Sequence, residues 1–182
     1  DETYVTRAGR IVKFLKSGFD DTFGGALWWN ESLVNVPSDG NSNKPACANG
    51  FATMFLLRYY KVCPAAEKGE VLDFAKTLYS WLVKNLRDPE DDCYWNDKAA
   101  NNGNINKTKW TYNSGAMISN GVLLYQITGD KSYLEQAIAT AEGSYNYFVR
   151  PIAPLALSYP DHDPWFTIKL VKAYIELLPY HK

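Results

Sequence analysis

Residues 128–137 read Thr-Gly-Asp-Lys-Ser-Tyr-Leu-Glu-Gln-Ala, and part of this stretch recurs along the chain. The recurring pattern is two adjacent apolar residues, then any two residues, then an alanine. Its copies start at Tyr4, Val71 and Tyr133. The copies lie about 65 residues apart, and each begins a unit of helix, long polar loop and second helix. Repeats of this kind are typical of stacked helical hairpins.

Apolar residues recur at helical spacing through most of the sequence. The first helix is expected to carry its apolar face from Tyr4 to Leu15, and Gly18 ends it. The other helices are expected at residues 45–62, 68–86, 113–127, 132–148 and 165–178. Two polar loops are expected at residues 19–43 and 87–110, and strand signals are weak, so residues 152–157 are expected to be an irregular segment.

The connections alternate between long loops and short links such as residues 128–130. A ring or solenoid of helical hairpins has this arrangement, with the long loops on one side. Because binding residues commonly lie in loops on a rigid scaffold, the functional side is expected to be the long-loop side. We therefore expect an all-α fold, a helical-hairpin toroid of the (α/α)6 barrel type or roughly half of one.

Composition excludes several classes of function. The formal net charge is −1, which gives no reason to expect a nucleic acid partner. No apolar run approaches 18 residues, so no membrane-spanning segment is expected. The three cysteines form no CxxC pair and the two histidines lie far apart, so we expect neither a metal site nor a cofactor. Aromatic residues reach 15%, which fits either a surface that stacks on sugar rings or a large aromatic core.

Residues 24–30 read Gly-Gly-Ala-Leu-Trp-Trp-Asn. The adjacent Gly24 and Gly25 would let the backbone approach a ligand closely. The adjacent Trp28 and Trp29 cannot both face one helical core, so at least one is expected to form a platform for a sugar ring. Alternatively, one tryptophan packs beneath the loops and the other has no role.

A second segment, residues 108–115, reads Thr-Lys-Trp-Thr-Tyr-Asn-Ser-Gly. Asn113 is the expected cap of the helix that begins there. Trp110, Tyr112 and Asn113 would then point from the helix start toward the space that the long loops surround. Asn49 occupies the equivalent place in the preceding hairpin and is expected to act in the same way.

Paired carboxylates are the residues that glycoside hydrolysis requires. Adjacent or near pairs occur at Asp20-Asp21, at residues 91–92 and at Asp161 with Asp163. The first pair is the strongest candidate because the segment from Gly24 follows it, although acidic loop residues are more often solvated turn formers. His162, between two aspartates, is expected to be a loop residue.

Taken together, three segments resemble glycoside hydrolase family 76. Residues 24–29 are similar to its Gly-Gly-Gly-Ile-Trp-Trp segment, residues 44–50 to its Lys-Asn-Ala-x-Ser-Asn-Gly segment, and residues 110–115 to its Trp-Thr-Tyr-Asn-Gln-Gly motif. The resemblance covers most of residues 1–148, in order. It implies an (α/α)6 barrel, retaining endo-hydrolysis of α-1,6-linked mannan, an oligo- or polysaccharide partner, and export to the periplasm, cell surface or medium.

One departure from the family pattern concerns catalysis. The family carries its catalytic pair in a Tyr-Asp-Asp-x-x-Trp-Trp segment, which residues 1–182 lack. The resemblance places that segment one helix before residue 1, which leaves Asp20 and Asp21 as fallback candidates. We expect a single (α/α) barrel-type domain over residues 1–182, incomplete at both ends and with apolar edges. The residues expected to bind substrate are Gly24, Gly25, Trp28, Trp29, Asn49, Trp110, Tyr112 and Asn113.

The leading hypothesis is therefore a mannan-degrading glycoside hydrolase. The alternative is a non-catalytic glycan-binding protein on the same helical scaffold, which would keep the aromatic residues without the catalytic acids. A helical-repeat scaffold for protein partners is less favoured because the distinctive residues lie in loops. An unsaturated glucuronyl hydrolase is disfavoured by the Trp-Thr-Tyr-Asn run that starts at Trp110.

Overall fold

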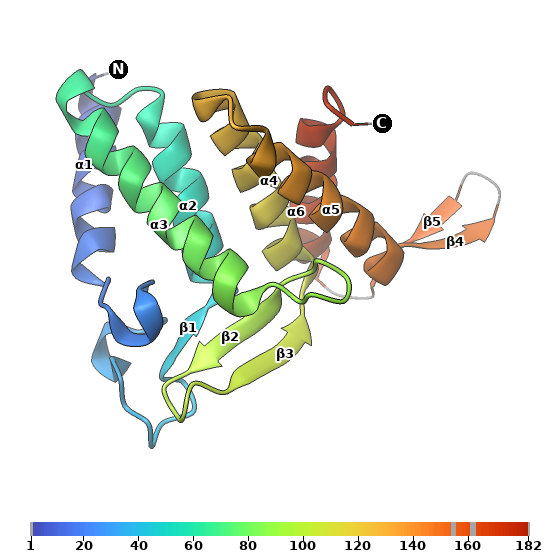
Figure 1. The fold of residues 1–182 in the computed structure, drawn as a ribbon, viewed down its shortest axis with the longest axis horizontal. Coiled ribbons are helices and arrows are strands. Elements are labelled where there is room, and N and C mark those ends of the chain that lie inside the picture. Colours follow the sequence, from blue (N-terminus) through green and yellow to red (C-terminus); the bar gives the residue numbers. More distant parts are fainter. Residues whose placement is uncertain (1, 154–155, 161–162, 182) are drawn as a thin grey trace. The chain divides into compact units, whose positions relative to one another are not determined.

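The computed structural model describes residues 2–153, 156–160 and 163–181, and helices are the main element in these ranges (Figure 1). The α-helices are α1 (Glu2–Ser17), α2 (Ala46–Tyr60), α3 (Lys68–Leu86), α4 (Thr111–Thr128), α5 (Lys131–Phe148) and α6 (Pro164–Leu177). The strands are β1 (Asn43–Pro45), β2 (Trp95–Ala99), β3 (Ile105–Lys109), β4 (Arg150–Ala153) and β5 (Ala156–Ser158). Single 3-10 turns are η1 (Thr22–Gly24), η2 (Glu31–Leu33) and η3 (Ala65–Glu67).

The six expected helices are present in the described residues. The prediction for residues 68–86 is confirmed at both ends by α3. Helix α5 also ends at the expected residue, Phe148, and the remaining boundaries differ by one or two residues, as is common at helix ends. One of these differences changes the expected role of a candidate site residue. Helix α4 begins at Thr111 rather than at Asn113, so Asn113 lies inside the helix.

The chain forms two compact units. Unit 1 comprises residues 1–86 and 96–107, and unit 2 comprises residues 87–95 and 108–182. The expectation of one barrel-type domain over the whole chain stays a prediction.

The core of unit 1 lies between α2 and α3, which pack along their length. Leu56 and Leu57 of α2 and Leu78 and Leu82 of α3 have no exposed surface. Each such side chain contributes about 1.5–3 kcal/mol when it leaves water. This hairpin therefore forms the rigid support on which the loop between α1 and α2 is built.

The expectation of a polar loop over residues 87–110 was wrong. Strands β2 and β3 form a hairpin that continues to β1 in a three-stranded sheet of order β1-β2-β3, with Lys44 opposite Lys98. The strands are polar, so they lack the alternation of apolar and polar residues that predicts a strand. Their turn carries Asn102 and Gly103 with φ of 59° and 68°, the conformation that makes Asn-Gly a strong hairpin signal.

A second small sheet forms where an irregular segment was expected. Strands β4 and β5 pair antiparallel, with Arg150 opposite Ser158 and a register shift between Pro151 and Ala153. The all-α expectation is thus corrected to a mostly helical fold with two small sheets in the described residues.

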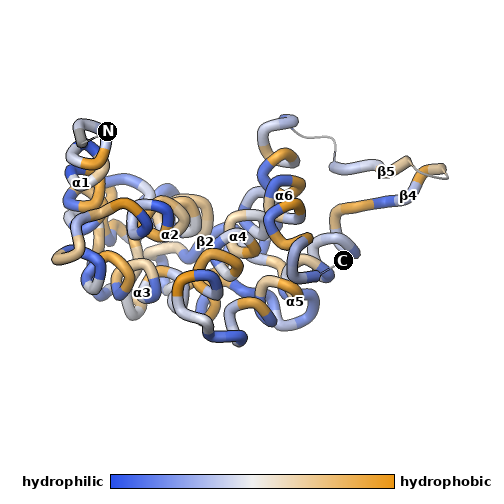
Figure 2. The backbone as a smooth tube through the Cα atoms, turned by 90° about the horizontal axis from the view of Figure 1, so that it is seen from above, coloured by the Kyte–Doolittle hydropathy of each residue, from blue (hydrophilic) through white to orange (hydrophobic). Residues whose placement is uncertain are grey.

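In unit 2, α4 packs against both α5 and α6. Two glycines of α4 permit the close approach: a methyl group on Gly115 would lie 2.9 Å from the Leu170 backbone, and one on Gly121 would lie 2.7 Å from the Tyr133 carbonyl oxygen. Figure 2 shows hydrophobic and hydrophilic residues alternating along α6, as expected of a helix with one packed face. Helix α4 is accordingly buried along nearly its whole length.

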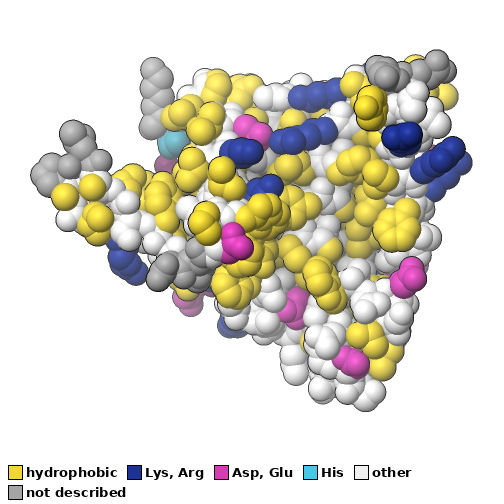
Figure 3. Space-filling view, turned by 180° about the vertical axis from the view of Figure 1, so that it is seen from behind, with side chains coloured by type: hydrophobic (Ala, Val, Ile, Leu, Met, Phe, Trp, Pro, Cys, Tyr) yellow, Lys and Arg dark blue, Asp and Glu magenta, His cyan; other side chains and the backbone are white. Residues whose placement is uncertain are grey.

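The first and last helices of the chain expose apolar side chains, as expected of apolar edges. Tyr4, Ile11 and Phe14 are exposed on α1, and Ile168 and Ile175 on α6. Figure 3 shows hydrophobic side chains at the surface among the charged ones. Within the described ranges, none of the helices has both the length and the apolar character needed to cross a membrane.

The close packing of α4 can be tested by adding one methyl group. Gly121→Ala should lower the free energy of unfolding by about 1–3 kcal/mol, because the added carbon meets the α5 backbone. Gly69→Ala is the control: nothing lies within 4 Å of the added carbon at that exposed helical position, so stability should stay level or rise. Denaturant unfolding measures both, and equal effects would contradict the packing described.

Candidate functional site

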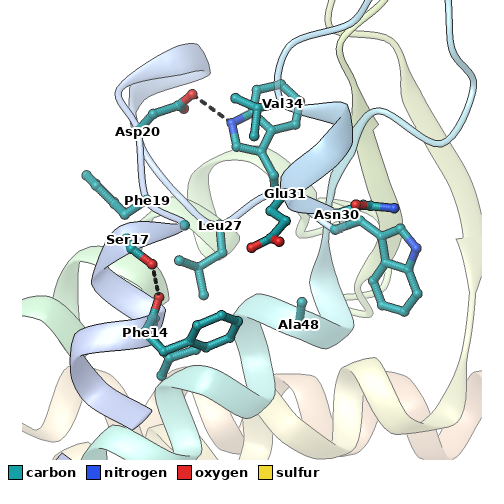
Figure 4. Close-up of a pocket in the computed structure, with 13 residues that line it drawn as sticks. Phe14, Ser17, Phe19, Asp20, Leu27, Asn30, Glu31, Val34 and Ala48 are labelled. Carbon is teal, nitrogen blue, oxygen red and sulfur yellow. Dashed lines mark hydrogen bonds between the residues drawn. The ribbon is translucent and has the colours of Figure 1, made fainter. Parts of the chain in front are cut away.

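Unit 1 contains a cavity of about 630 Å³ between the end of α1, the following loop and the first turn of α2 (Figure 4). Apolar side chains form much of its wall, among them Phe14, Leu27 and Val34. In Figure 4 the Glu31 carboxylate extends into the space bounded by Leu27, Phe14 and Ala48. The cavity thus offers an apolar wall with a few polar groups, the usual character of a ligand site.

Trp28 and Trp29 lie at this cavity and face opposite ways. Trp28 is only 7% exposed, and its indole N–H donates to Asp20 Oδ2 at 2.7 Å. Trp29 is 58% exposed, and its backbone N–H donates to the Asn43 carbonyl oxygen at 2.9 Å. One indole is therefore packed in the loop, and the other is available to a ligand.

The two glycines before the tryptophans serve the backbone. Gly24 has a φ of 85° and Gly25 a φ of 120°, values that L-residues with side chains rarely adopt. Gly25 is buried, and a methyl group there would lie 3.2 Å from the Phe19 ring. Phe23 before them has a φ of 59° and Ala26 after them a φ of 81°, so four consecutive residues of this loop have a positive φ.

Asn49 supports the cavity wall from behind. Its amide oxygen accepts from the Leu27 N–H at 2.7 Å, and its amide nitrogen donates to the carbonyl oxygens of Leu27 at 3.0 Å and Pro45 at 2.9 Å. The residue is completely buried. The structure therefore gives Asn49 a backbone-holding role, and its expected contact with substrate stays a prediction.

The side chain of Lys44 is completely buried and carries a charge that the loop must satisfy. Its ammonium group donates to Asp20 Oδ1 at 2.5 Å and to the carbonyl oxygens of Asp20, Thr22, Gly25 and Ala26 at 2.7–3.1 Å. Burial lowers the pKa of Lys44, and the hydrogen bond and charge of Asp20 oppose that shift. Sequence reasoning missed this lysine because nothing in residues 44–50 marks it as buried.

The fallback catalytic candidates have unequal environments. Burial raises the pKa of Asp20, but hydrogen bonds from Lys44 and Trp28 outweigh it and hold that pKa below its ordinary value. A general acid needs a raised pKa, so Asp20 is unsuited to protonate a leaving group near neutral pH. Asp21 is exposed, while Glu31, which sequence reasoning did not select, lies in the cavity wall with Asp20. Catalysis by Asp20 or Asp21 stays a prediction.

Unit 2 brings together the other expected binding residues at the start of α4. Trp110 and Tyr112 are half-buried, and their rings stack with centroids 6.3 Å apart and planes 6° apart. Phe166 meets both rings edge-on, at 5.7 Å from Trp110 and 4.6 Å from Tyr112. Trp165 lies 6.1 Å from Tyr112 and is half-exposed, so it extends this aromatic group to the surface.

Sequence reasoning did not select Trp165 or Phe166 for the site. The available signal was an aromatic pair directly after Pro164 at a helix start. Asp163 caps that helix, because its carboxylate accepts from the Trp165 N–H at 2.8 Å. Asp161 and His162, which also drew attention in the sequence, lie outside the described residues.

The expectation that Asn113 caps α4 was wrong. Trp110 occupies the cap position, and the Asn113 N–H donates to the Trp110 carbonyl oxygen at 3.1 Å, which places Asn113 inside the first turn. Its side chain is 1% exposed, and neither its amide nitrogen nor its amide oxygen has a hydrogen-bond partner in the described structure. The buried hydroxyl of Thr111 also has no hydrogen-bond partner in the described structure. Buried polar groups normally find partners, so these two residues form a polar spot with unmet bonding capacity.

The second acidic pair has structural partners. Asp91 accepts from the Lys109 ammonium group at 2.7 Å, and Asp92 pairs with Arg87 at 2.5 Å. These ion pairs give residues 91–92 a structural role in the turn between α3 and β2. A methyl group on Gly143 of α5 would overlap the Asp91 carbonyl oxygen, so the turn lies directly against that helix.

The cysteines are free, with Cys63 and Cys93 buried and Cys47 half-buried. Across the described ranges, no cluster of three or more His, Cys, Asp or Glu side chains is arranged to hold a metal ion.

The chain was compared with known proteins. The profile described as Glycosyl hydrolase family 76 matches residues 1–157. A mannan endo-1,6-alpha-mannosidase, DCW1, of Candida glabrata is 27% identical over 132 residues, which are 70% of this chain and 28% of that protein.

Solved structures match over the whole chain. A GH76 alpha-mannanase of Bacteroides thetaiotaomicron is 27% identical with a TM-score of 0.84, covering 100% of this chain and 47% of that one. An inactive alpha-1,6-mannanase of Salegentibacter sp. HEL1_6, with two aspartates replaced by asparagine and alpha-1,6-mannotriose bound, is 29% identical with a TM-score of 0.79, covering 100% and 52%. The present chain thus spans about half the length of the solved relatives and 28% of the curated one.

The glycine pair gives a matched test of the loop geometry. Gly25→Ala should lower the free energy of unfolding by about 1–3 kcal/mol, because only glycine adopts its backbone conformation without strain and because Phe19 occupies the space. Gly24→Ala should cost less, about 1 kcal/mol, since nothing lies within 4 Å of the added carbon. Thermal or denaturant unfolding measures the difference, and a larger loss at Gly24 would refute the described conformation.

Proposed function

The chain belongs to glycosyl hydrolase family 76, and we propose that the intact protein is a glycoside hydrolase that cleaves α-1,6-linked mannan by a retaining endo mechanism. The family match over residues 1–157 carries the proposal. It is supported by a relative named as a mannan endo-1,6-alpha-mannosidase and by one named as an alpha-1,6-mannanase. The proposed partner is accordingly an oligo- or polysaccharide of mannose.

The proposed scaffold is a helical toroid of the (α/α)6 type. Its support is the alternation of long loops and short links, together with the TM-score of 0.84 over the whole chain to the Bacteroides alpha-mannanase. In such a scaffold the loop from Asp20 to Asn43 and the segment before Thr111 would present residues to a sugar chain. Export from the cytoplasm is proposed with it, since a polysaccharide too large to cross a membrane is met outside.

Retaining hydrolysis divides the reaction between two carboxyl groups. One carboxylate attacks the anomeric carbon and forms a glycosyl–enzyme bond as the glycosidic bond breaks. The other, protonated, gives its proton to the leaving oxygen and then takes one from the water that releases the sugar. Asp20 is held ionised by Lys44, so we propose that the intact protein supplies this pair from outside residues 1–182.

The described residues would then act in binding. Trp29 in unit 1, and Trp110 with Tyr112 in unit 2, present aromatic faces on which the C–H face of a mannose ring can stack. The unpartnered amide of Asn113 is a buried group able to bond a sugar hydroxyl or a bound water. Binding energy from such contacts would hold the scissile bond in position for attack.

The alternative is a non-catalytic glycan-binding protein on the same scaffold. It is favoured by one observation: the Asp20 carboxylate accepts hydrogen bonds from Lys44 and Trp28. Because of these bonds, the best-placed acid of this chain does not serve in proton transfer. This alternative predicts binding of mannan without any release of product.

Incubation of the intact protein with linear α-1,6-mannan separates the two functions. We expect short manno-oligosaccharides to appear, and proton NMR of the first products should show the α-anomer before mutarotation. A β-1,4-mannan serves as the control substrate and should stay intact. Binding without release would establish the alternative, and neither binding nor release would refute both.

The two tryptophans offer a second test. Trp29→Ala should raise KM for α-1,6-manno-oligosaccharides about tenfold, equivalent to about 1.4 kcal/mol, and leave Tm nearly unchanged because the ring is exposed. Trp28→Ala should lower stability by about 3–5 kcal/mol, because it empties a buried site. Initial rates and thermal unfolding of both variants decide the matter. A normal KM in folded Trp29→Ala protein would remove this residue from the binding site.

A further inference from the structure

The buried aspartate–lysine contact of unit 1 is part of a three-residue cluster, here called the first cluster (Asp20, Trp28 and Lys44). Asp20 Oδ1 accepts from the Lys44 ammonium group at 2.5 Å and from the Thr22 N–H at 3.0 Å. Asp20 Oδ2 accepts from the Trp28 indole N–H at 2.7 Å. The ammonium group also lies 4.9 Å from the centre of the Trp28 ring. One carboxylate thus joins a buried cation, an indole and its own turn.

Unit 2 repeats this arrangement in a second cluster (Asp88, Trp95 and Lys109). Asp88 Oδ2 accepts from the Lys109 ammonium group at 2.6 Å and from the Trp95 indole N–H at 3.0 Å. Asp88 Oδ1 accepts from the Glu90 N–H at 3.0 Å, two residues along the chain as in the first cluster. The lysine and aspartate side chains are each 10% exposed.

The two clusters are also equivalent in sequence. The members of the second cluster lie 68, 67 and 65 residues after their counterparts in the first, which matches the spacing of the helical repeat. Lys44 belongs to β1 and Lys109 ends β3. Each lysine lies two residues before the first residue of the helix that follows, α2 or α4. The same three residue types therefore recur once in each unit, with an aspartate as the acceptor and a turn two residues long, although the lysine shares its carboxylate oxygen with the turn N–H in the first cluster and with the indole in the second.

Each cluster has an aromatic residue of the proposed site as its chain neighbour. Trp29 follows Trp28, and its N–H is bonded to the Asn43 carbonyl oxygen, next to Lys44. Trp110 follows Lys109 and occupies the cap position of α4. The bonds that hold Trp28 therefore also hold the backbone of Trp29, and those that hold Lys109 also hold the backbone of Trp110.

We propose that the two clusters are copies of one device in which an aspartate, an indole and a lysine position an aromatic sugar-binding residue: Trp29, which follows the indole member of the first cluster, and Trp110, which follows the lysine member of the second. The cluster members are positioning residues, which act through these two tryptophans. The inference rests on the proposed function, because it gives the positioned residues a sugar to bind. It also explains why the acid before Trp28 is tied to a cation instead of facing a substrate.

A positioning role requires the aspartates and lysines of both clusters to stay charged, so that their ion pairs persist. Burial raises the pKa of each aspartate, but the hydrogen bonds from its lysine, its indole and its turn, together with the charge of the lysine, outweigh burial, so the pKa of both Asp20 and Asp88 is lowered. Burial lowers the pKa of Lys109, but the hydrogen bonds that its ammonium group donates to Asp88 and Asp91, together with their negative charges, outweigh burial and raise that pKa. The stabilisation from the aspartates is therefore complete above about pH 4 and is lost only as pH falls further.

Kinetics of the intact protein test the second cluster. Lys109→Met should raise KM for α-1,6-manno-oligosaccharides about fivefold to tenfold and change kcat less than about twofold, because misplacing a binding group weakens binding before it alters the reacting atoms. Lys109→Arg should restore KM, since arginine can bond both Asp88 and Asp91. Lys16→Met removes the exposed ion pair with Glu70 on α1 and α3 and should leave KM unchanged.

Indole N–H spectra supply a readout that does not depend on activity. In a protein labelled with ¹⁵N at tryptophan, the indole signals of Trp28 and Trp95 should shift as pH falls below about 4, when their carboxylate acceptors take up protons. Trp29, whose indole has no role in either cluster, should not follow them. Asp88→Asn should remove the shift of Trp95 and leave that of Trp28 in place.

The outcomes are separable. A normal KM in folded Lys109→Met protein, or a Trp95 signal that responds to pH like that of Trp29, would overturn the inference. If the wild-type protein neither binds nor cleaves mannan, the proposed function fails, and with it the sugar as ligand. The indole spectra then still decide whether the clusters exist as described.

Discussion

The ammonium group of Lys44 lies among five oxygen atoms, four of them backbone carbonyls, in a side chain without exposed surface. Removing such a charge from water costs several kcal/mol unless its bonds are met in full. All five oxygens come from residues 20–26, so this loop must follow the path that surrounds the cation. That path includes the left-handed backbone of Gly24 and Gly25, and it delivers Trp28 inward and Trp29 outward.

Much of the helical framework could be predicted from the sequence, because helical periodicity and stop signals are local. The bounds of α3 follow directly from the apolar spacing of residues 68–86. The β2–β3 hairpin could not be predicted in this way, since its strands are polar and its pairing with β1 involves residues more than 50 positions away. Its Asn102-Gly103 turn was a usable signal that was assigned to a loop.

The site divides in the same manner. That Trp28 and Trp29 must differ in environment follows from their adjacency alone. Which of the two is buried depends on the hydrogen bond from the Trp28 indole to Asp20, eight residues earlier in the chain. No local sequence pattern predicts that Asp20 bonds Trp28 rather than Trp29. Asn49 and Asn113 are equivalent in the repeat, yet the Asn49 side chain bonds the neighbouring backbone, whereas the Asn113 side chain has no hydrogen-bond partner among the described residues. Equivalence in a repeat thus predicts position well and bonding poorly.

The two units are discontinuous in sequence, and this has a consequence for any attempt to divide the chain. The polypeptide passes from unit 1 to unit 2 after Leu86, returns at Asn96, and leaves again after Lys107. A single cut at any of these crossings would leave part of one unit on the fragment that carries the other. A cut after Leu86, for example, would separate β1 from its partner β2. A cut after Leu86 would take residues 96–107 from unit 1, and a cut after Lys107 would take residues 87–95 from unit 2. The covalent order of the chain therefore links the completion of each unit to the other.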